Sequence, residues 1–311
     1  MNDLIVSVSP HYHKPGSRTQ RIMLDVIIAL MPALVAACII FGMRSLLLTA
    51  FSAANCVFLE WAWNKLRKQE QTVSDLSAVV TGIILAFNVP VSMPIWMLMV
   101  GDFIAIIIVK MLFGGIGCNF ANPALVGRIS MMLSFTSEMT AYNTQVAAVD
   151  VLSSATPLAA MDKLDMSHFL TLFLGQHGGV LGETCALALI IGFIYLLVRG
   201  VIKPHITVSF VLSALVFTFL FNGFNAQAAL LSVFSGGLLL GAIFMATDYV
   251  TSPLTGKGRV IFGIGIGFLA SAIRTFASSA EGVSFAILLM NLLVPYINGW
   301  SRTKPLGGAK A

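Results

Sequence analysis

The chain has 311 residues, of which 58% are hydrophobic and only 10% are charged, and its net charge is +5. Soluble globular domains contain about 25% charged residues, so this composition excludes that class and indicates an integral membrane protein. The basic residues show no interleaved basic and aromatic pattern, so no nucleic-acid partner is expected.

Apolar runs long enough to cross about 30 Å of hydrocarbon as helices recur along the whole chain. We expect an all-α polytopic fold with about ten transmembrane helices. In chain order, the expected spans are 22–41, 44–63, 75–90, 95–112, 123–135, 181–198, 206–221, 226–246, 260–276 and 282–299. The fifth is short and follows a glycine-rich approach, so a half-buried loop with a broken helix is an alternative there. No small-residue cleavage site follows the first span, and a removable signal peptide is not expected.

The distribution of basic residues predicts the orientation of these spans. With an even number of spans, both termini lie on one side of the membrane, and all but three of the 18 Lys and Arg residues fall on that side. The three exceptions are Arg44, Lys163 and Arg274. Cytoplasmic loops are enriched in Lys and Arg, so both termini are predicted to be cytoplasmic.

The segment 136–180 separates two groups of five expected spans, and an odd number in each group gives the groups opposite orientations. The stretch GIILAFNVPVSMP (82–94) aligns without gaps on GAIFMATDYVTSP (241–253). We therefore predict two inverted five-helix halves, with sites at broken helices near their interface. Ordinary span ends remain an alternative for both stretches.

These boundaries give five predicted regions. They are a cytoplasmic N-terminal segment 1–21, a first transmembrane half 22–135, an extracytoplasmic segment 136–180, a second transmembrane half 181–299, and a cytoplasmic tail 300–311.

Two cytoplasmic loops contain candidate binding residues. In GGIGCNFANPALVGR (114–128), Asn122 is placed to cap a helix that begins with Pro123, and Arg128 adds a charge about one turn later. Amide donors together with this charge could hold a phosphate or carbonyl group. A tight turn with close helix packing is the alternative. In the second loop, TDYVTSPLTGKGR (247–259), Asp248 is the only carboxylate.

Asp102 lies some seven residues inside the fourth expected span. An ionisable residue at that depth points to a functional role by default, here as an ion relay or as the partner of a buried base. Asp25, Glu60 and Glu183 lie nearer the ends of spans, where we expect interfacial positions. The GIGIG stretch (263–267) resembles a nucleotide-binding loop but lies within a span, so it favours close helix approach.

The stretch DVLSSATPLAA (150–160) is rich in small and hydroxyl residues, which is unusual in so apolar a chain. It lies in the predicted extracytoplasmic segment. From its sequence alone, Thr156 could cap a helix that begins at Pro157.

Taken together, these stretches resemble the family that contains the D subunit of the Rnf complex and the B subunit of the sodium-translocating NADH:quinone oxidoreductase. The resemblance covers nearly the full length. The stretches that carry it are SPHYH (9–13), 114–128, 150–160, GQHGGVLGET (175–184), ATDYVTSP (246–253) and EGVSFAILLMN (281–291). Only about 20 residues precede the first span, which favours the D-subunit type over the B-subunit type.

In that family, a flavin transferase recognises roughly Asp-x-x-Ser/Thr-Gly-Ala-Thr and joins FMN through its phosphate to the final threonine. The resemblance therefore implies a covalent FMN on Thr156, with Asp150, Ser153 and Ala155 completing the motif and Ser154 in place of the usual glycine. The predicted topology puts Thr156 on the extracytoplasmic side, where the transferase acts.

The resemblance also implies a function and partners. The chain would be a membrane-embedded flavoprotein subunit of a ferredoxin:NAD oxidoreductase that couples electron transfer to sodium or proton transport in a bacterial or archaeal cytoplasmic membrane. A second, noncovalent flavin is a further possibility. Residues considered for holding flavin or quinone-like rings are Asn119, Asn122, Arg128, Glu183 and Asp248.

Expected partners are membrane lipid, the flavin transferase, and other membrane and peripheral subunits that carry iron–sulfur clusters and flavins. The four cysteines have no iron–sulfur or zinc spacing, which fits a flavin subunit whose partners carry the clusters.

Two other functions remain open from the sequence. Ten spans in inverted halves suit a small-solute channel or transporter, for which Asp102 and the broken helices would form the site. A purely structural membrane anchor for redox partners is the third. Covalent flavin distinguishes the first function from both.

Overall fold

The computed structural model describes residues 17–141, 169–175, 178–183, 185–277 and 282–301. This described part is built from helices and contains no β-strand. The predicted flavin-attachment residues Asp150, Ser153, Ala155 and Thr156 lie outside it.

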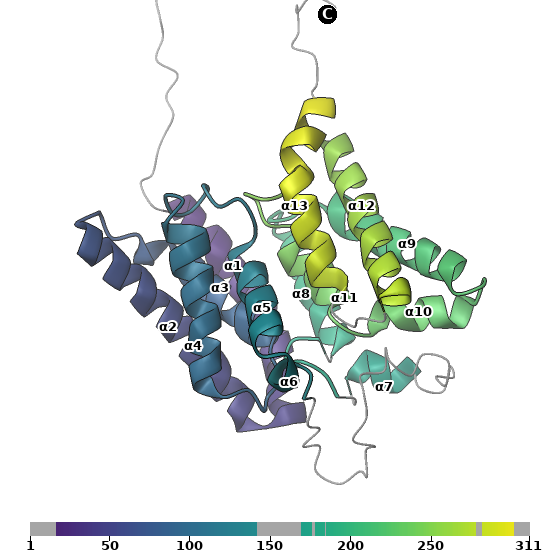
Figure 1. Cartoon of the computed structure of the whole chain (residues 1–311), viewed down its shortest axis with the longest axis horizontal. Coiled ribbons are helices and arrows are strands. Elements are labelled where there is room, and N and C mark those ends of the chain that lie inside the picture. Colours follow the sequence, from purple (N-terminus) through teal and green to yellow (C-terminus); the bar gives the residue numbers. More distant parts are fainter. Residues whose placement is uncertain (1–16, 142–168, 176–177, 184, 278–281, 302–311) are drawn as a thin grey trace, which may run out of the picture.

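Two helical bundles stand side by side (Figure 1). The first consists of α1 (Ser17–Phe41), α2 (Met43–Arg67), a 3₁₀ turn (Val73–Asp75), α3 (Ser77–Phe87), α4 (Ile95–Phe103) continuing as a π-helix (Ile104–Met111), α5 (Pro123–Ser134) and α6 (Thr136–Met139). The second consists of α7 (Phe169–Leu174), α8 (Ala186–Val198), α9 (Pro204–Phe221), α10 (Ala226–Phe234), α11 (Leu238–Leu240) continuing as a π-helix (Gly241–Met245), α12 (Gly256–Phe276) and α13 (Gly282–Trp300).

Each of the ten predicted spans contains helix, but not every helix is long enough to cross a membrane. Among the described residues, α1, α2, α9, α12 and α13 meet the requirements of length and apolarity, and α10 with α11 forms a sixth candidate bent by 63°. The helix α3 has 11 residues and α8 has 13, both shorter than expected. The chain is thus a helical protein with several candidate spans, while ten crossings and inverted halves stay predictions.

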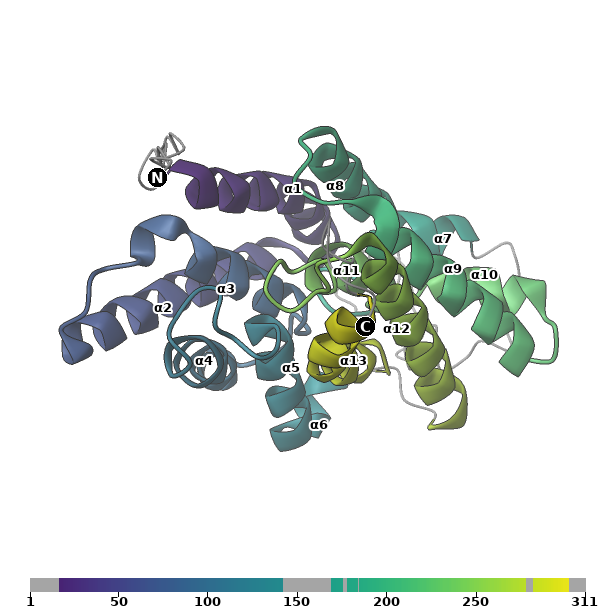
Figure 2. The same cartoon turned by 90° about the horizontal axis from the view of Figure 1, so that it is seen from above.

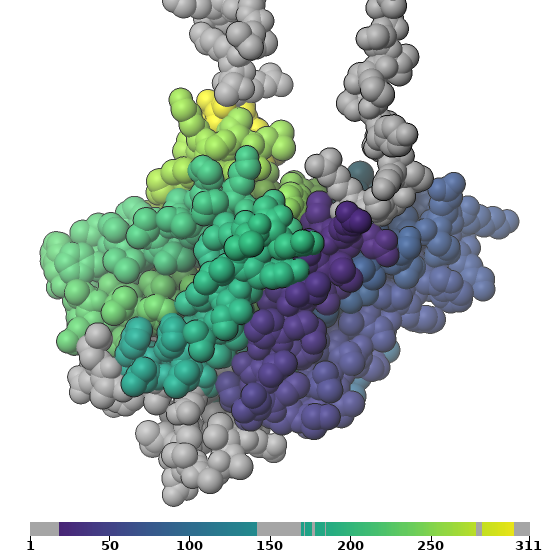
Figure 3. All heavy atoms as spheres, turned by 180° about the vertical axis from the view of Figure 1, so that it is seen from behind, coloured from purple at the N-terminus to yellow at the C-terminus, as the bar shows by residue number. Residues whose placement is uncertain are grey.

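Helices of the two bundles pack against each other at α1 with α8 and at α5 with α13 (Figure 2). Figure 3 shows α1 and α8 lying together on the rear surface. Gly192 lets α8 approach closely, because a Cβ there would overlap the carbonyl oxygen of Ala29. Asp25 of α1 adds to this contact by accepting hydrogen bonds from Tyr195 at 3.0 Å and from Arg199 at 3.2 Å.

Glycines explain the close packing of α9 against α12. A Cβ on Gly263 or Gly267 would overlap the hydroxyl of Ser209 or Ser213, respectively. Small residues of this kind let two helical backbones come together. The structure therefore confirms that the GIGIG stretch serves close helix approach.

The short helix α3 is completed by a segment of the second bundle. The backbone N–H of Gly182 donates to the carbonyl of Phe87 at 2.8 Å, and that of Leu181 donates to Val89 at 3.1 Å. These bonds satisfy carbonyl groups that a helix end leaves free. The chain beyond Phe87 can therefore stay irregular although it is buried.

The helix α1 begins, and α13 ends, at the same end of the molecule, whereas α6 and α7 lie at the opposite end (Figure 1). We call the first end the terminal face. The predicted topology assigns it to the cytoplasm.

Candidate functional site

A cavity of about 300 Å³ lies between the bundles, toward the terminal face. Its walls come from the first turns of α1, from α3, from the loop before α5, and from the segments around residues 196–202 and 243–250 of the second bundle. This volume is at the lower end of the roughly 300–1,000 Å³ typical of small-molecule sites. Both halves of the chain are needed to enclose it.

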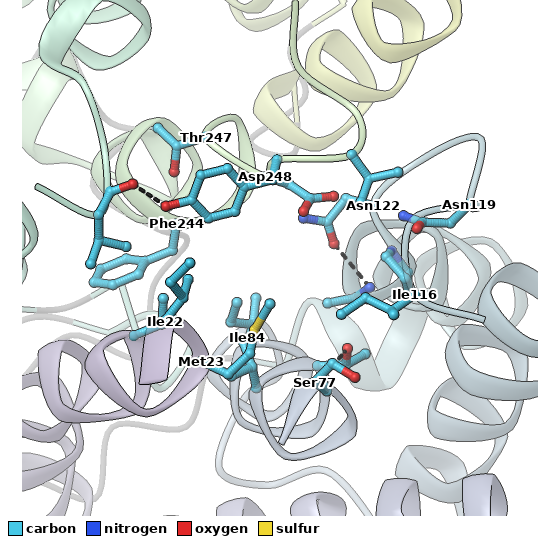
Figure 4. A pocket seen from close by; sticks show the side chains of 18 of the residues that line it. Ile22, Met23, Ser77, Ile84, Ile116, Asn119, Asn122, Phe244, Thr247 and Asp248 are labelled. Atoms are coloured by element: carbon cyan, nitrogen blue, oxygen red, sulfur yellow. Dashed lines mark hydrogen bonds between the residues drawn. The ribbon is translucent and has the colours of Figure 1, made fainter. Parts of the chain in front are cut away.

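Polar side chains gather on one side of this cavity. Asn119, Asn122, Thr247 and Asp248 lie there, facing the apolar side chains of α1 and α3 (Figure 4). Three residues that the sequence predicted to bind a cofactor, Asn119, Asn122 and Asp248, are thereby brought together. They come from loops more than a hundred positions apart in the chain.

Asn122 connects the two halves at the cavity wall. Its Oδ1 accepts hydrogen bonds from the backbone N–H groups of Ala124 at 3.1 Å and Leu125 at 3.4 Å, so the predicted cap of α5 is confirmed. Its Nδ2 donates to the carbonyl oxygen of Met245 at 3.2 Å, where the π-helix of the second bundle ends. One side chain therefore fixes both the start of α5 and the end of the bent helix.

Asp248 is held in the loop after that π-helix. Burial raises the pKa of its carboxyl group, although hydrogen bonds from Thr251, the backbone of Val250 and Asn119 partly oppose the rise. The bond from the Thr251 hydroxyl measures 3.0 Å. A carboxyl group in this setting holds its proton more tightly than an exposed aspartate does.

Lys110 lies in the cavity wall beside Ser77, and it leads to a buried ion pair. Its Nζ donates to the Ser77 hydroxyl at 2.6 Å and lies 2.7 Å from Oε2 of Glu60. The other carboxylate oxygen of Glu60 accepts from Thr72 at 2.5 Å, and Thr72 accepts in turn from Asn64 at 3.0 Å. Glu60 is 1% exposed, so its carboxylate is buried within the protein, and its position relative to the membrane stays a prediction.

Asp102 lies deeper in the first bundle and does not line the cavity. Its Oδ1 accepts from Ser52 at 2.6 Å and from the Cys56 thiol at 3.4 Å, and its Oδ2 accepts from Asn55 at 2.8 Å. The side chain is fully buried. The partners shown for this carboxylate are therefore neutral donors from α2.

Arg128 and Glu183 also lie away from the cavity. Arg128 forms a buried ion pair with Glu183, with 3.0 Å between Nη2 and Oε1, and it donates to the side-chain oxygen of Asn88. A Cβ on Gly237 would overlap Oε1 of Glu183. The two charges thus pack against the bend between α10 and α11, where they join both halves.

The pairs Glu60–Lys110, Arg128–Glu183 and Asp25–Arg199 were not predicted from the sequence. One signal was available on α2, where Ser52, Cys56, Glu60 and Asn64 repeat every four positions and so share one helix face. All four are buried. Their spacing marks a polar face, but it does not identify partners on other helices.

Comparison with known proteins gives consistent matches over the whole chain. The profile of the NQR2, RnfD, RnfE family matches residues 5–307. The D subunit of a sodium-translocating ferredoxin:NAD⁺ oxidoreductase complex from Acetobacterium woodii is 42% identical, covering 99% of this chain and 96% of the relative. The D subunit of an ion-translocating oxidoreductase complex from Actinobacillus succinogenes is 36% identical, with 96% of each chain covered. The D subunit of a proton-translocating ferredoxin:NAD⁺ oxidoreductase complex from Clostridium ljungdahlii is also 36% identical, covering 98% of this chain and 97% of the relative.

Proposed function

Because the chain belongs to the NQR2, RnfD, RnfE family, we propose that it is the D subunit of an ion-translocating ferredoxin:NAD⁺ oxidoreductase complex. The observation that carries this proposal is similarity over the full length to relatives with that role, at up to 42% identity. Their names specify sodium in one case and protons in another, and the proposal includes both ions. Other subunits of the complex would supply the iron–sulfur clusters.

We further propose that Thr156 carries FMN through a phosphoester bond. Asp150, Ser153 and Ala155 stand at the positions that a flavin transferase would recognise, and Ser154 replaces the usual glycine. Serine is small, as glycine is, so this change keeps the small-residue character of the motif. Predicted topology places this segment on the side of the membrane opposite the termini.

The cavity is the proposed place for a second, noncovalent flavin. Its apolar walls, with Ile22, Met23 and Ile84, suit the faces of a flat ring system. The amides of Asn119 and Asn122 and the carboxyl of Asp248 offer both donors and acceptors to the polar edge of such a ring. A bound flavin would supply one- and two-electron transfer, while these residues would orient it and keep water from its faces.

Asp102 is the proposed ion relay of this chain. An ionisable side chain in the interior of a membrane helix is costly, and its presence there points to a function. Its three neutral donors can hold the carboxylate in place while leaving its charge available to a passing cation or proton.

A small-solute transporter is the competing function. The bent pair α10 and α11, with 63° between its parts, and a cavity shared by both halves favour it. A transporter has no need of covalent flavin, so the flavin content decides between the two functions.

The test is in-gel flavin fluorescence of the denatured full chain, expressed together with a flavin transferase. We expect a fluorescent wild-type band that is absent in Thr156→Val and retained in Thr144→Val, a control in the same segment. The noncovalent site is measured separately, as the amount of flavin that acid precipitation releases. Asn119→Ala should lower this amount without changing the in-gel fluorescence. A dark wild-type band, with another substrate labelled by the same transferase, would contradict covalent attachment.

A further inference from the structure

A second cavity, of about 270 Å³, opens beside the first at the terminal face. The two share part of their walls, and the hydroxyl of Tyr249 donates to the carbonyl of Val201 at this shared wall. We call the second cavity the basic pocket. Lys203 and Arg259 line it, and its lining includes no Asp or Glu among the described residues.

Three polar side chains in this pocket have donor groups without a hydrogen-bond partner in the described part of the chain. Arg259 uses its Nε to donate to the carbonyl of Pro253 at 3.0 Å, which fixes the guanidinium but leaves its two Nη groups without a hydrogen bond there. The Lys203 ammonium and the Ser252 hydroxyl likewise make none. Ser252 as a whole is only 8% exposed, and it lines the pocket.

The first turn of α9 adds to the positive potential of the pocket. The helix has 18 residues, Lys203 occupies its cap position without a side-chain cap, and Ile206 of the first turn lines the pocket. The N-terminal turn of a helix presents free amide donors and carries a partial positive charge.

We propose that the basic pocket binds a phosphate-bearing anion. Two cations, a buried hydroxyl and an uncapped helix start together meet the needs of a phosphate group, and the described lining has no carboxylate to compete. The apolar side chains of Ile22, Ile202 and Ile206 make the rest of the wall. Basic pockets between membrane helices bind anionic lipid headgroups, and a soluble phosphate compound would use the same contacts. This site is inferred without use of the proposed flavins, although its wall is partly shared with the first cavity.

The test uses the purified full chain in three settings: nanodiscs of phosphatidylglycerol, nanodiscs of phosphatidylcholine, and detergent titrated with inorganic phosphate. Thermal unfolding is compared for wild type, Lys203→Gln/Arg259→Gln, and Lys257→Gln. Lys257 is a matched control because it lies two positions from Arg259 but does not line the pocket. Native mass spectrometry counts retained phospholipid.

We expect an anion-dependent gain in melting temperature for wild type and Lys257→Gln, and its loss in the double variant. Each lost charge-assisted contact should weaken binding roughly tenfold. A gain in phosphatidylglycerol alone assigns the headgroup, and a gain with inorganic phosphate assigns a soluble source. The proposal is overturned if wild type gains nothing in either arm, or if the double variant gains as much as wild type. Ser252→Ala, which removes no charge, checks for misfolding and should weaken binding less than the double variant does.

Discussion

Glu60 of α2 and Lys110 of the π-helical end of α4 are 50 positions apart in the chain, yet their Oε2 and Nζ atoms lie 2.7 Å apart. Both side chains are almost fully buried. Since Lys110 also lines the cavity, this ion pair connects the cavity wall with the polar face of α2.

Removing one partner of this pair should be much worse than removing both. Lys110→Met leaves the Glu60 carboxylate buried without its counter-ion, which costs about 3–5 kcal/mol, whereas Glu60→Leu/Lys110→Met should recover most of the loss. Thermal unfolding of the purified variants in detergent gives their melting temperatures, which should be lowest for Lys110→Met. Lys257→Met, an exposed control, should behave as wild type. Equal melting temperatures for the single and double variants would contradict the buried pair.

Asp102→Asn should impair ion pumping more than it lowers flavin content. The amide keeps the size of the side chain but removes the charge on which a relay depends. Ion uptake by proteoliposomes containing the complex is compared with covalent flavin per chain, with the exposed Glu70→Gln as control. If the Asp102 variant kept both its redox activity and its ion pumping, the proposed role of Asp102 as an ion relay would be contradicted.

Asp248→Asn should change how stability depends on pH. Burial raises the pKa of Asp248 above its usual value of 3.8, so the folded chain holds this proton more tightly than the unfolded chain. Wild type therefore loses stability as the pH rises from that usual value through the raised folded value. The variant lacks this loss, and its melting temperature relative to wild type should increase over the same range. A difference that stays constant with pH would speak against a raised pKa.

Gly82→Ala should destabilise the first bundle by about 1–3 kcal/mol. The new Cβ would lie 2.7 Å from Cα of Ala53 on α2. A side chain could relieve such a clash by changing its rotamer, but a backbone atom cannot. Gly299→Ala is the control because a Cβ there meets nothing within 4 Å, and alanine should favour α13 by up to about 1 kcal/mol. Thermal unfolding should separate the two variants clearly; similar melting temperatures would mean that α2 and α3 are not so closely packed.

The sequence predicted those features that depend on local patterns. An asparagine before a proline predicted the cap at Asn122, and the glycines of the GIGIG stretch predicted close helix approach, for which the structure shows α9 to be the partner of α12. Asn119, Asn122 and Asp248 were selected as cofactor-binding candidates, and they line one cavity. That agreement concerns their position, while their role stays a prediction.

Features that depend on distant parts of the chain were missed. Hydropathy measures the length of an apolar run, but it cannot show where the helix inside that run ends, because buried irregular backbone is just as apolar. For this reason the expected span continues to residue 90, whereas the helix α3 ends at Phe87. Likewise, Glu183 lies at the edge of an apolar run in the sequence, but packing turns it inward to Arg128.

The bonds from Leu181 and Gly182 to the end of α3 impose an order on biogenesis. The ribosome makes α3 well before it makes residues 181 and 182, so in a nascent first half the carbonyl groups of Phe87 and Val89 lack the partners that they have in the complete chain. The first bundle can therefore reach its final form only after the intervening segment has been synthesised. Completion of the first bundle thus follows, and does not precede, synthesis of the start of the second half.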